Sequence, residues 1–399
     1  MTHLLTINTG SSSLKAAVYD MGHGEAIVLV VQFERIGQPH SQMRIMNAER
    51  ETLVDEELPL PDHTAALEAL LDWLKSHEGG VEPDAVGHRV VHGGAAYSEP
   101  QLIDDNLVTV LSRLVPIDPL HLPQAIDAIE ATRRAYPDSP QVACFDTAFH
   151  RHMPRVAQMY ALPRRLEKEG VVRYGFHGLS YEYIMFELRS LDREAARGRV
   201  VIAHLGNGAS MAGVKDGVSV DTTMGFTPTG GLVMGTRPGD LDPGVLLYLL
   251  QSEDMSPDQL DTLLNKQSGL LGVSEISADM HDLLDRESQD KRASEAVALF
   301  CYQARKYLGA LTASLGGLDT LVFTAGIGEH AAPVRERICA GLEFLGIRLD
   351  LDRNMRSAPI ISHEDSRVVI RVMHTDEDVM IARHTYRIIS HTGASRVSV

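Results

Sequence analysis

The feature that most constrains the fold is a structural unit that occurs twice along the chain. In each copy an apolar, strand-like run ends in a turn of small residues, a second strand follows, and an Asp/Gly turn leads to a third strand. The first copy runs from Leu4 to Phe33, and the second begins at Arg199, about 200 residues later. Short apolar runs bounded by Gly, Asn, Asp and Ser are typical of strands joined by tight turns. The repetition therefore predicts two domains of similar topology.

Strands and helices alternate after each copy, which is typical of a layered α/β fold. In the first half the pattern predicts helices at 63–77 and 123–136 and strands at 86–91 and 141–145. In the second half it predicts helices at 291–315 and 333–345, strands at 319–324 and 368–373, and a last helix from about 379. The repeated layout assigns residues 1–149 and 380–399 to one domain and residues 150–379 to the other, with the two small-residue turns facing across a cleft.

The overall charge excludes several classes of partner. The 399 residues include 54 acidic and 37 basic side chains, which gives a formal net charge of −17. Nucleic acids and anionic membranes select basic surfaces, so neither is an expected partner. The three cysteines, Cys144, Cys301 and Cys339, are far apart and odd in number, which argues for free thiols in a reducing compartment. No apolar run is long enough to span a membrane, and we expect a cytoplasmic location.

Glycine-rich turns at the ends of strands are the first candidates for chemistry. Glycine permits close backbone approach, and exposed N–H groups in such turns bind anions. None of these turns has the P-loop or the dinucleotide-binding pattern, and any one of them alone is more often an ordinary connection. Lys15, Arg89 and Arg237 stand in or beside Gly-rich segments, and this combination indicates phosphate or carboxylate binding. The four turns are Gly10–Ser13, Gly206–Ser210, Gly230–Gly239 and Gly326–Gly328.

Polar side chains at the ends of strands suit a hard cation. Asn8 ends the first predicted strand, Asp146 closes the strand at 141–145, and Glu377 comes just after the last strand. Mg²⁺ prefers such oxygen ligands and keeps several of its waters. The alternative is that the two carboxylates cap helices, and both interpretations stay open.

Two of the 18 histidines stand in segments that favour a function. His177 lies in an aromatic and Gly-rich turn, and His121 is framed by prolines. No paired spacing predicts a zinc site. The functional alternative to a surface or core position is donation of a hydrogen bond to a transferring phosphoryl group.

Several motifs taken together resemble the acetokinase family. They are Asn8–Lys15, Tyr174–Gly178, His204–Gly208, Met234–Arg237 with Gly239–Gly244, and Phe323–Glu329. The resemblance runs from residue 4 to about residue 385. It implies an α/β fold of two ribonuclease-H-like domains of duplicated topology around a nucleotide cleft, as in the superfamily of acetate and sugar kinases, actin and heat-shock chaperones. This agrees with the duplicated unit described above.

The resemblance also implies roles for individual residues. Asn8 and Glu377 would hold Mg²⁺, with Mn²⁺ as an alternative metal. The catalytic set would be Arg89 on the substrate carboxylate, His177 and Arg237 on the transferring phosphoryl group, Asp146 as catalytic acid and His121 positioning the phosphate. The residues around ATP would be Ser11, Ser13, Lys15, His204, Leu205, Gly206, Asn207, Gly208, Asp279, Met280, His281, Gly326, Ile327, Gly328, Glu329 and His330.

Three places depart from the family pattern, and two of them are predicted nucleotide residues; the third is Gly230-Gly231, where the family often has an acid. His281 stands where the family usually has Arg, and His330 stands where it usually has Asn. A mostly neutral imidazole offers less charge than a guanidinium group, so we expect His281 to weaken the binding of the nucleotide.

The reaction implied by the resemblance is reversible transfer of a phosphoryl group from ATP to acetate, giving ADP and acetyl phosphate, by a homodimeric enzyme. A carboxylate nucleophile is already ionised at pH 7, so a general base is not required, and Asp146 is expected to orient a magnesium-bound water or the substrate. The alternatives are a propionate or butyrate kinase of the same family and a nucleotide-gated binding ATPase on the same fold.

Overall fold

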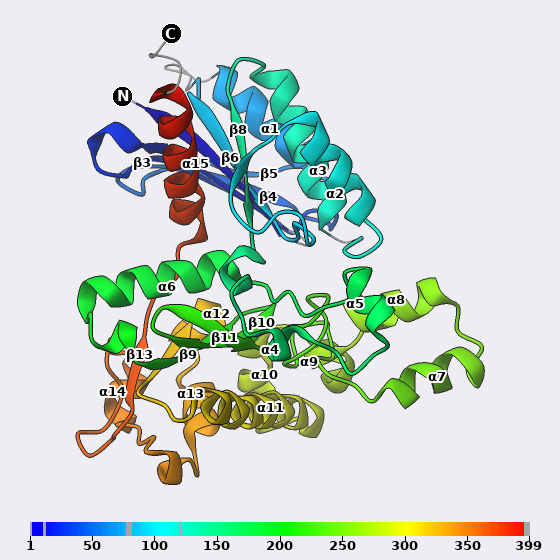
Figure 1. The fold of residues 1–399 in the computed structure, drawn as a ribbon, viewed down its shortest axis with the longest axis vertical. Helices are drawn as coiled ribbons and strands as arrows, with labels where there is room; N and C mark the ends of the chain where they lie inside the picture. Colours follow the sequence, from blue (N-terminus) through cyan, green and yellow to red (C-terminus); the bar gives the residue numbers. More distant parts are fainter. Residues whose placement is uncertain (1, 11–12, 77–81, 120, 395–399) are drawn as a thin grey trace. The chain divides into compact units, whose positions relative to one another are not determined.

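The computed structural model describes residues 2–10, 13–76, 82–119 and 121–394. The chain forms two compact units (Figure 1). The first unit comprises Met1–Ala148 and Asp376–Val399, and the second comprises Phe149–Thr375. These divisions fall at 148/149 and 375/376, whereas the sequence placed them at 149/150 and 379/380.

An eight-stranded sheet forms the centre of the first unit, in the order β5-β4-β3-β2-β1-β6-β8-β7. Strands β1 and β6 pair in parallel, as do β6 and β8, whereas β1, β2, β3, β4 and β5 pair antiparallel. The strands are β1 His3–Thr9, β2 Leu14–Asp20, β3 Ala26–Glu34, β4 Gln42–Asn47, β5 Thr52–Glu57, β6 Ala85–Val90, β7 Gln101–Leu102 and β8 Gln141–Phe145. The helices are α1 His63–Ser76, α2 Asp105–Leu114, α3 Leu122–Ala135 and α15 Glu377–Ala394.

The second unit contains a five-stranded sheet in the order β11-β10-β9-β12-β13. The strands are β9 Arg199–Leu205, β10 Ala209–Lys215, β11 Val218–Thr222, β12 Thr320–Thr324 and β13 Val369–Val372. The helices are α4 Arg155–Gln158, α5 Arg164–Lys168, α6 Gly178–Leu191, α7 Pro243–Gln251, α8 Pro257–Lys266, α9 Gly269–Ser274, α10 Met280–Arg286, α11 Lys291–Leu315, α12 Ala325–His330, α13 Ala332–Cys339 and α14 Leu351–Met355.

The two sheets share one topology. The central strands of the first unit, β3-β2-β1-β6-β8, correspond in order and direction to β11-β10-β9-β12-β13 in the second. In each set three antiparallel strands are followed by two parallel ones. This confirms the predicted α/β fold of two ribonuclease-H-like domains of duplicated topology.

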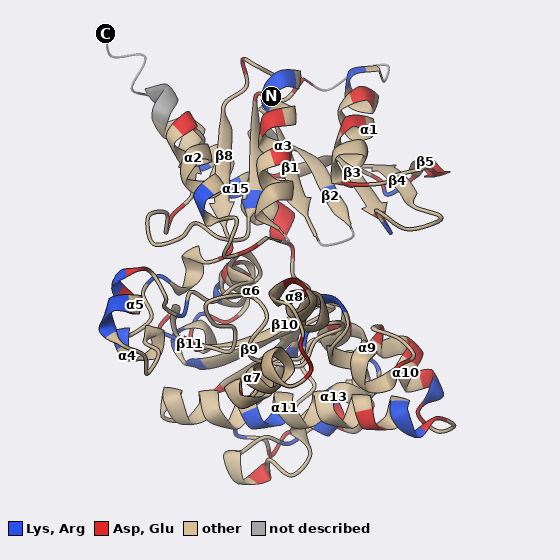
Figure 2. Ribbon diagram, turned by 90° about the vertical axis from the view of Figure 1, so that its right-hand side faces the viewer, with Lys and Arg blue, Asp and Glu red and all other residues tan. Residues whose placement is uncertain are grey.

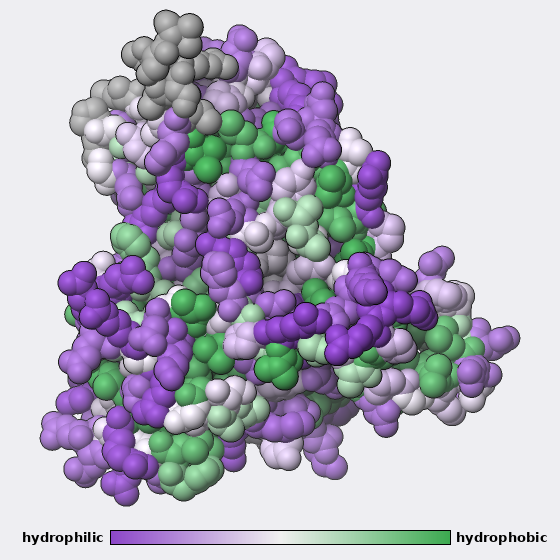
Figure 3. All heavy atoms as spheres, viewed as in Figure 1, coloured by the Kyte–Doolittle hydropathy of each residue, from purple (hydrophilic) through white to green (hydrophobic). Residues whose placement is uncertain are grey.

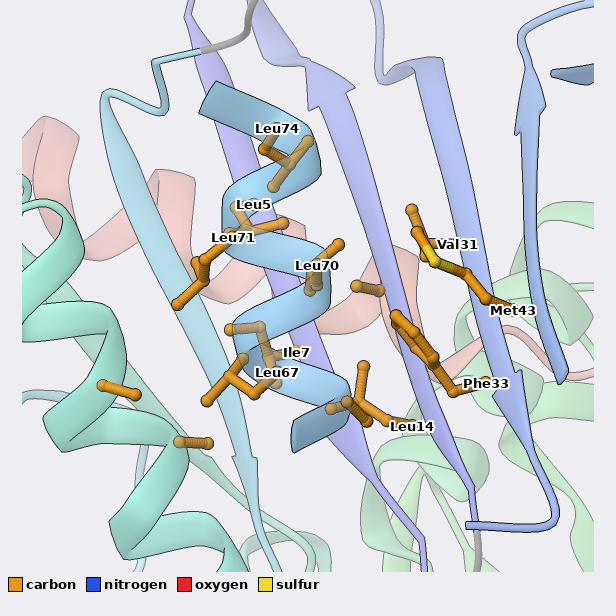
Figure 4. Close-up of a cluster of buried hydrophobic side chains, with 14 of the residues drawn as sticks. Leu5, Ile7, Leu14, Val31, Phe33, Met43, Leu67, Leu70, Leu71 and Leu74 are labelled. Atoms are coloured by element: carbon orange, nitrogen blue, oxygen red, sulfur yellow. The ribbon is translucent and has the colours of Figure 1, made fainter. Parts of the chain in front are cut away.

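Local sequence explains the hairpins and the core. Asp216 and Gly217 join β10 to β11 with φ angles of 52° and 80°, which is the left-handed pair that a type I′ hairpin turn requires. In the first unit, leucines at helical spacing on α1 pack against apolar residues of the sheet (Figure 4). Leu67, Leu70 and Leu74 are at most 2% exposed, and each such buried side chain contributes roughly 1.5–3 kcal/mol.

Two predicted elements differ in the structure. The turn expected at Gly326–Gly328 is part of the short helix α12. The helix expected over 333–345 ends at Cys339, because Gly341 adopts a φ of 77° that a continuing helix cannot use. The sequence analysis also missed β4 and β5. The strand β5 is almost entirely exposed and therefore lacks an apolar alternation, whereas β4 has alternating buried residues, Met43 and Ile45, that were overlooked.

The structure bears on the expected partners as well. Figure 2 shows basic residues gathered on α4 and α5, where Arg155 Nη2 lies 2.7 Å from Glu167 Oε1 and Arg165 Nη1 lies 3.8 Å from Glu169 Oε1. Acidic neighbours thus partly neutralise the charge of α4 and α5.

The three cysteines are buried and form no disulfide, as expected. Within the described ranges, no helix has both the length and the apolar character needed to cross a membrane.

Candidate active site

The topology of the first unit brings three predicted site residues to one edge of its sheet. Asn8 lies near the end of β1, Arg89 near the end of β6, and Asp146 directly after β8. These three strands are parallel neighbours, so their carboxyl ends lie at the same edge. Glu377, the first residue of α15, joins them there.

Hydrogen bonds connect these four side chains into one cluster. Arg89 donates from Nη2 to Asp146 Oδ2 at 2.6 Å and from Nε to both Asp146 oxygens at 3.1 Å. Its Nη1 donates to Asn8 Oδ1 at 3.0 Å. Asn8 Nδ2 in turn donates to Glu377 Oε2 at 3.0 Å. In this cluster the carboxylate of Asp146 binds Arg89, a contact that neither sequence interpretation included.

Burial makes these charges depend on one another. Asp146 is fully buried, and the Arg89 side chain is 14% exposed. Burial alone would lower the pKa of Arg89, but the carboxylates of Asp146 and Glu377 raise it above its usual value. Burial raises the pKa of Asp146, and Arg89 opposes that rise. Arg89 therefore compensates the charges of the buried Asp146 and the half-buried Glu377.

Asp378 adds a carboxylate that the sequence did not single out. Its Oδ1 is buried and has no hydrogen-bond partner among the described residues. Burial and, next, the charge of Asp376 raise the pKa of Asp378 to about 7, and Lys15 opposes the rise. Lys15 itself is exposed on β2 and pairs in register with Asn8 on β1. An unpartnered carboxylate oxygen beside Asn8 and Glu377 fits a cation site.

The types of side chain present limit which metal ion the site near Asn8 and Glu377 suits. Within the described ranges, no group of three or more His, Cys, Asp and Glu side chains is arranged to enclose a metal ion. A site built on Asn8 and Glu377 alone suits Mg²⁺, which is usually held by one or two carboxylates together with waters and substrate phosphates.

His121 is held by an acid that the sequence reasoning also missed. His121 Nδ1 lies 2.8 Å from Asp118 Oδ1, and Asp118 is 3% exposed. The charge of His121 also acts to lower the pKa of Asp146. His121 thus acts on the first unit's cluster through its charge. The spacing of three residues between Asp118 and His121 is the sequence signal for their pairing.

In the second unit, His177, His204 and Arg237 come together around a glycine. The rings of His177 and His204 stack with centroids 4.2 Å apart and planes inclined by 18°. A β-carbon on Gly208 would lie 2.9 Å from Arg237 Nη2 and 3.2 Å from His177 Nε2. The absent side chain of Gly208 therefore leaves space into which both nitrogens project.

A cavity of about 540 Å³ lies within the second unit. Eight predicted nucleotide residues line it: Gly206, Asn207, Asp279, Met280, His281, Gly326, Ile327 and His330. The strands β9 and β12 are parallel neighbours, which brings the segments that follow them to one edge. The sequence missed four lining residues: Ala278, Leu284, Ala331 and Pro333. Leu284 was detectable, because it lies one helical turn after Met280 on α10.

The other predicted nucleotide residues lie elsewhere. Leu205 and Gly328 are buried, and Glu329 Oε2 lies 3.0 Å from His374 Nδ1. In the first unit Ser13 closes the β1–β2 turn, since its carbonyl accepts from Gly10 N–H at 2.8 Å. Ser11 lies outside the described residues.

Arg335 binds the helix α12, which forms part of the wall of this cavity. It is fully buried and uses all five of its N–H donors. Its Nη1 donates to the carbonyls of Gly328 and Glu329 at 2.9 Å, and these are C-terminal carbonyls of α12. The remaining donors bind Asn354 and Ser357. Arg335 therefore satisfies helix-end carbonyls that would otherwise be buried without partners.

Comparisons with known proteins agree over the whole chain. A model of the acetokinase family matches residues 3–383. The chain is 46% identical to an acetate kinase of Rhodopseudomonas palustris, over 96% of this chain and 98% of that protein. The crystal structure of Porphyromonas gingivalis acetate kinase superposes with a TM-score of 0.86 at 37% identity, covering 98% of this chain and 100% of that one. A propionate kinase from Francisella tularensis gives 0.89 at 35% identity, covering 97% and 100%.

Proposed function

The chain belongs to the acetokinase family, and we propose that it catalyses reversible phosphoryl transfer from ATP to acetate. The observation that carries the proposal is the Arg89 cluster of the first unit. Arg89 donates three of its five N–H groups to Asp146 and Asn8. Among the described residues, this leaves one donor on each terminal nitrogen for a substrate carboxylate, the group that Arg binds through paired hydrogen bonds.

Nucleotide binding is assigned to the cavity of the second unit. Its volume lies within the usual range for small-molecule sites, and Met280, Leu284, Ile327 and Pro333 give it apolar walls. Such walls suit the flat, weakly polar faces of a purine base. The backbone of Gly206 and Gly326, which can be approached closely, suits the sugar and phosphates.

The chemical step needs positioning and charge neutralisation more than covalent help. We assign Arg237 and His177 to the transferring phosphoryl group, because their nitrogens project into one space beside Gly208. His121, held by Asp118, would position the phosphate. Acetate is ionised at pH 7, so no base is required. We therefore assign Asp146 to the orientation of Arg89 instead of proton transfer.

Magnesium is the metal that the first unit's residues fit. Asn8 and Glu377 would hold it, and the unpartnered Oδ1 of the neighbouring Asp378 supports a cation at this place. When bound, Mg²⁺ supplies positive charge that offsets the negative charge of the phosphates. Asn8, Glu377 and Lys15 contribute the orientation and the remaining charge.

The acceptor and the assembly are further parts of the proposal. Propionate is the second candidate acceptor, since a propionate kinase is among the structural relatives.

We propose a homodimer, because an exposed apolar surface lies at α7. Val245 and Leu247 on this helix and Leu241 just before it are exposed, and Figure 3 shows apolar surface over the helix. The three free thiols favour a cytoplasmic location.

An acyl-phosphate trapping assay tests the function. The enzyme is incubated with ATP, Mg²⁺ and acetate, propionate or butyrate, and the acyl phosphate is captured with hydroxylamine. We expect acetyl hydroxamate as the main product, and Arg237→Ala should lower kcat by at least about 100-fold. No product with any acid would favour a nucleotide-gated binding protein. A loss below about threefold in Arg237→Ala would remove that residue from the phosphoryl site.

A further inference from the structure

Two parallel chains of hydroxyl groups end on the stacked histidines of the second unit. In one chain, Tyr181 OH lies 2.5 Å from Ser210 Oγ, which lies 2.7 Å from His177 Nδ1. In the other, Thr375 Oγ1 lies 2.8 Å from Ser180 Oγ, which lies 2.7 Å from His204 Nδ1. In both cases a fully buried serine contacts the Nδ1 atom of the ring.

The number of hydrogens limits how the first chain can be arranged. Ser210 has one hydroxyl hydrogen and two partners, so it can donate to only one of them. A phenol is a more acidic donor than an alkyl alcohol, so the short contact at 2.5 Å is best made by Tyr181 O–H donating to Ser210. The hydrogen of Ser210 is then available for His177, and when Ser210 donates it, Nδ1 is the acceptor.

The surroundings of His177 disfavour a second ring proton. Arg237 Nη2 and His177 Nε2 both project beside Gly208, which places a permanent positive charge near the ring. Two protonated imidazoles stacked 4.2 Å apart would also repel each other. A neutral His177 that accepts at Nδ1 carries its one proton on Nε2.

We propose that Tyr181 and Ser210 are positioning residues that fix His177 in the tautomer with the proton on Nε2. This places an N–H donor, instead of a lone pair, beside Arg237 in the space left by Gly208. Only a donor can bind an anionic phosphoryl oxygen. The inference rests on the phosphoryl role proposed for His177 and names the groups that make that role possible.

Nitrogen NMR of the full-length enzyme labelled with ¹⁵N-histidine tests the proposal. The His177 signals are assigned by their loss in His177→Asn. In the wild type we expect Nδ1 to resonate as an unprotonated nitrogen and Nε2 as a protonated one. In Tyr181→Phe, Ser210 loses its donor and can accept from Nδ1–H, so the Nδ1 signal should move toward the protonated range. The kcat should fall at least about tenfold, with the KM for ATP changed less than twofold.

The controls separate this inference from the proposed function. Tyr302→Phe removes a hydroxyl from a side chain of a residue that is 62% exposed and should change neither spectrum nor kcat. A protonated Nδ1 in the wild type overturns the proposal, even if Tyr181→Phe fails to fold. An unchanged kcat in a Tyr181→Phe variant whose Nδ1 signal has moved also overturns it. The wild-type spectrum does not depend on turnover, so a failed acyl-phosphate assay would refute the function and leave the tautomer assignment standing.

Discussion

The two units hold their functional side chains in different ways. In the first unit, hydrogen bonds join Asn8, Arg89, Asp146 and Glu377, and the charged groups are buried or half-buried. In the second unit, neutral hydroxyls, stacked rings and a glycine shape the site, and the cavity has apolar walls. In the first unit, the side chains of the site therefore also contribute to the stability of the fold. In the second unit, the site depends on the space beside Gly208, which a larger residue would fill.

The difference predicts two kinds of response to substitution. Changes in the first unit's cluster should reduce stability and activity together, because a buried charge loses its partner. Changes around Gly208 should reduce activity with little loss of stability, because the atom that an added β-carbon approaches most closely is the end of the long Arg237 side chain.

The largest effect is expected for Arg89→Met. It leaves the buried carboxylate of Asp146 and the half-buried carboxylate of Glu377 without their cation. Removal of one partner from a buried pair typically costs about 3–5 kcal/mol of unfolding free energy. It also removes the guanidinium group that we assign to the substrate carboxylate, so kcat/KM for acetate should fall about 100- to 1,000-fold. Chemical denaturation and the acyl-phosphate assay measure the two losses.

The matched control is Arg199→Met in the second unit. Arg199 also makes a bidentate pair, with Asp319, but its side chain is 35% exposed and that of Asp319 43%. Solvent-exposed pairs contribute about 0–1 kcal/mol, and activity should not change. Equal losses of stability in the two variants would contradict the contrast between the units.

The second effect concerns Gly208→Ala. The added β-carbon would come within 2.9 Å of Arg237 Nη2 and 3.2 Å of His177 Nε2, so both donors must move. We expect kcat to fall about 100-fold, as for loss of one transition-state donor, with a melting temperature within about 2 °C of the wild type. Gly309→Ala on α11, where nothing lies within 4 Å of the added carbon, should leave kcat unchanged. A strongly destabilised Gly208→Ala would show that the space serves packing.

The sequence located the residues that we assign to substrate binding better than the residues that hold them in place. Asn8, Asp146 and Gly206 stand at the ends of apolar strands, and parallel pairing carries strand ends to one edge, so position along the chain was informative. Asp118, Tyr181 and Arg335 act on other protein groups, so no glycine turn or strand end marks them.

The elements of the fold that the sequence predicted also differ in kind from those that it did not predict. Buried strands such as β9 were predictable because every residue from Val200 to Leu205 is apolar or inward-facing. The exposed strand β5 carries no such pattern, and its pairing with β4 decides its conformation. The end of α13 depended on a backbone angle at Gly341 that the apolar periodicity did not reveal.

A third effect should be equal in the two units. Each contains a buried histidine, His88 in the first and His150 in the second, and burial lowers the pKa of each to about 4. The unfolded chain binds these protons near pH 6.5, so stability present above that pH is lost as the pH falls toward about 4. The slope should be about 1.4 kcal/mol per pH unit for each histidine.

Denaturation between pH 7.5 and pH 4.5 measures this slope. His150→Gln and His88→Gln should each flatten it by about one proton, and the double variant by about two. A slope unchanged in both single variants would mean that other groups cause the acid sensitivity.

The smallest effect is expected where the sequence departs from its family, at His281. The residue lines the cavity at the start of α10, and its Nδ1 lies 3.4 Å from Asp285 Oδ2. An arginine there would add a full positive charge, but Asp285 would compete for it, and the site is exposed. His281→Arg should therefore lower the KM for ATP only about two- to fivefold, with kcat within twofold of the wild type.

The control is His363→Arg, which adds the same charge at a half-exposed loop position of the second unit outside the cavity lining. It should leave the KM for ATP unchanged. A KM that stays constant or rises in His281→Arg would mean that the apolar walls, and not charge, set the affinity of this cavity.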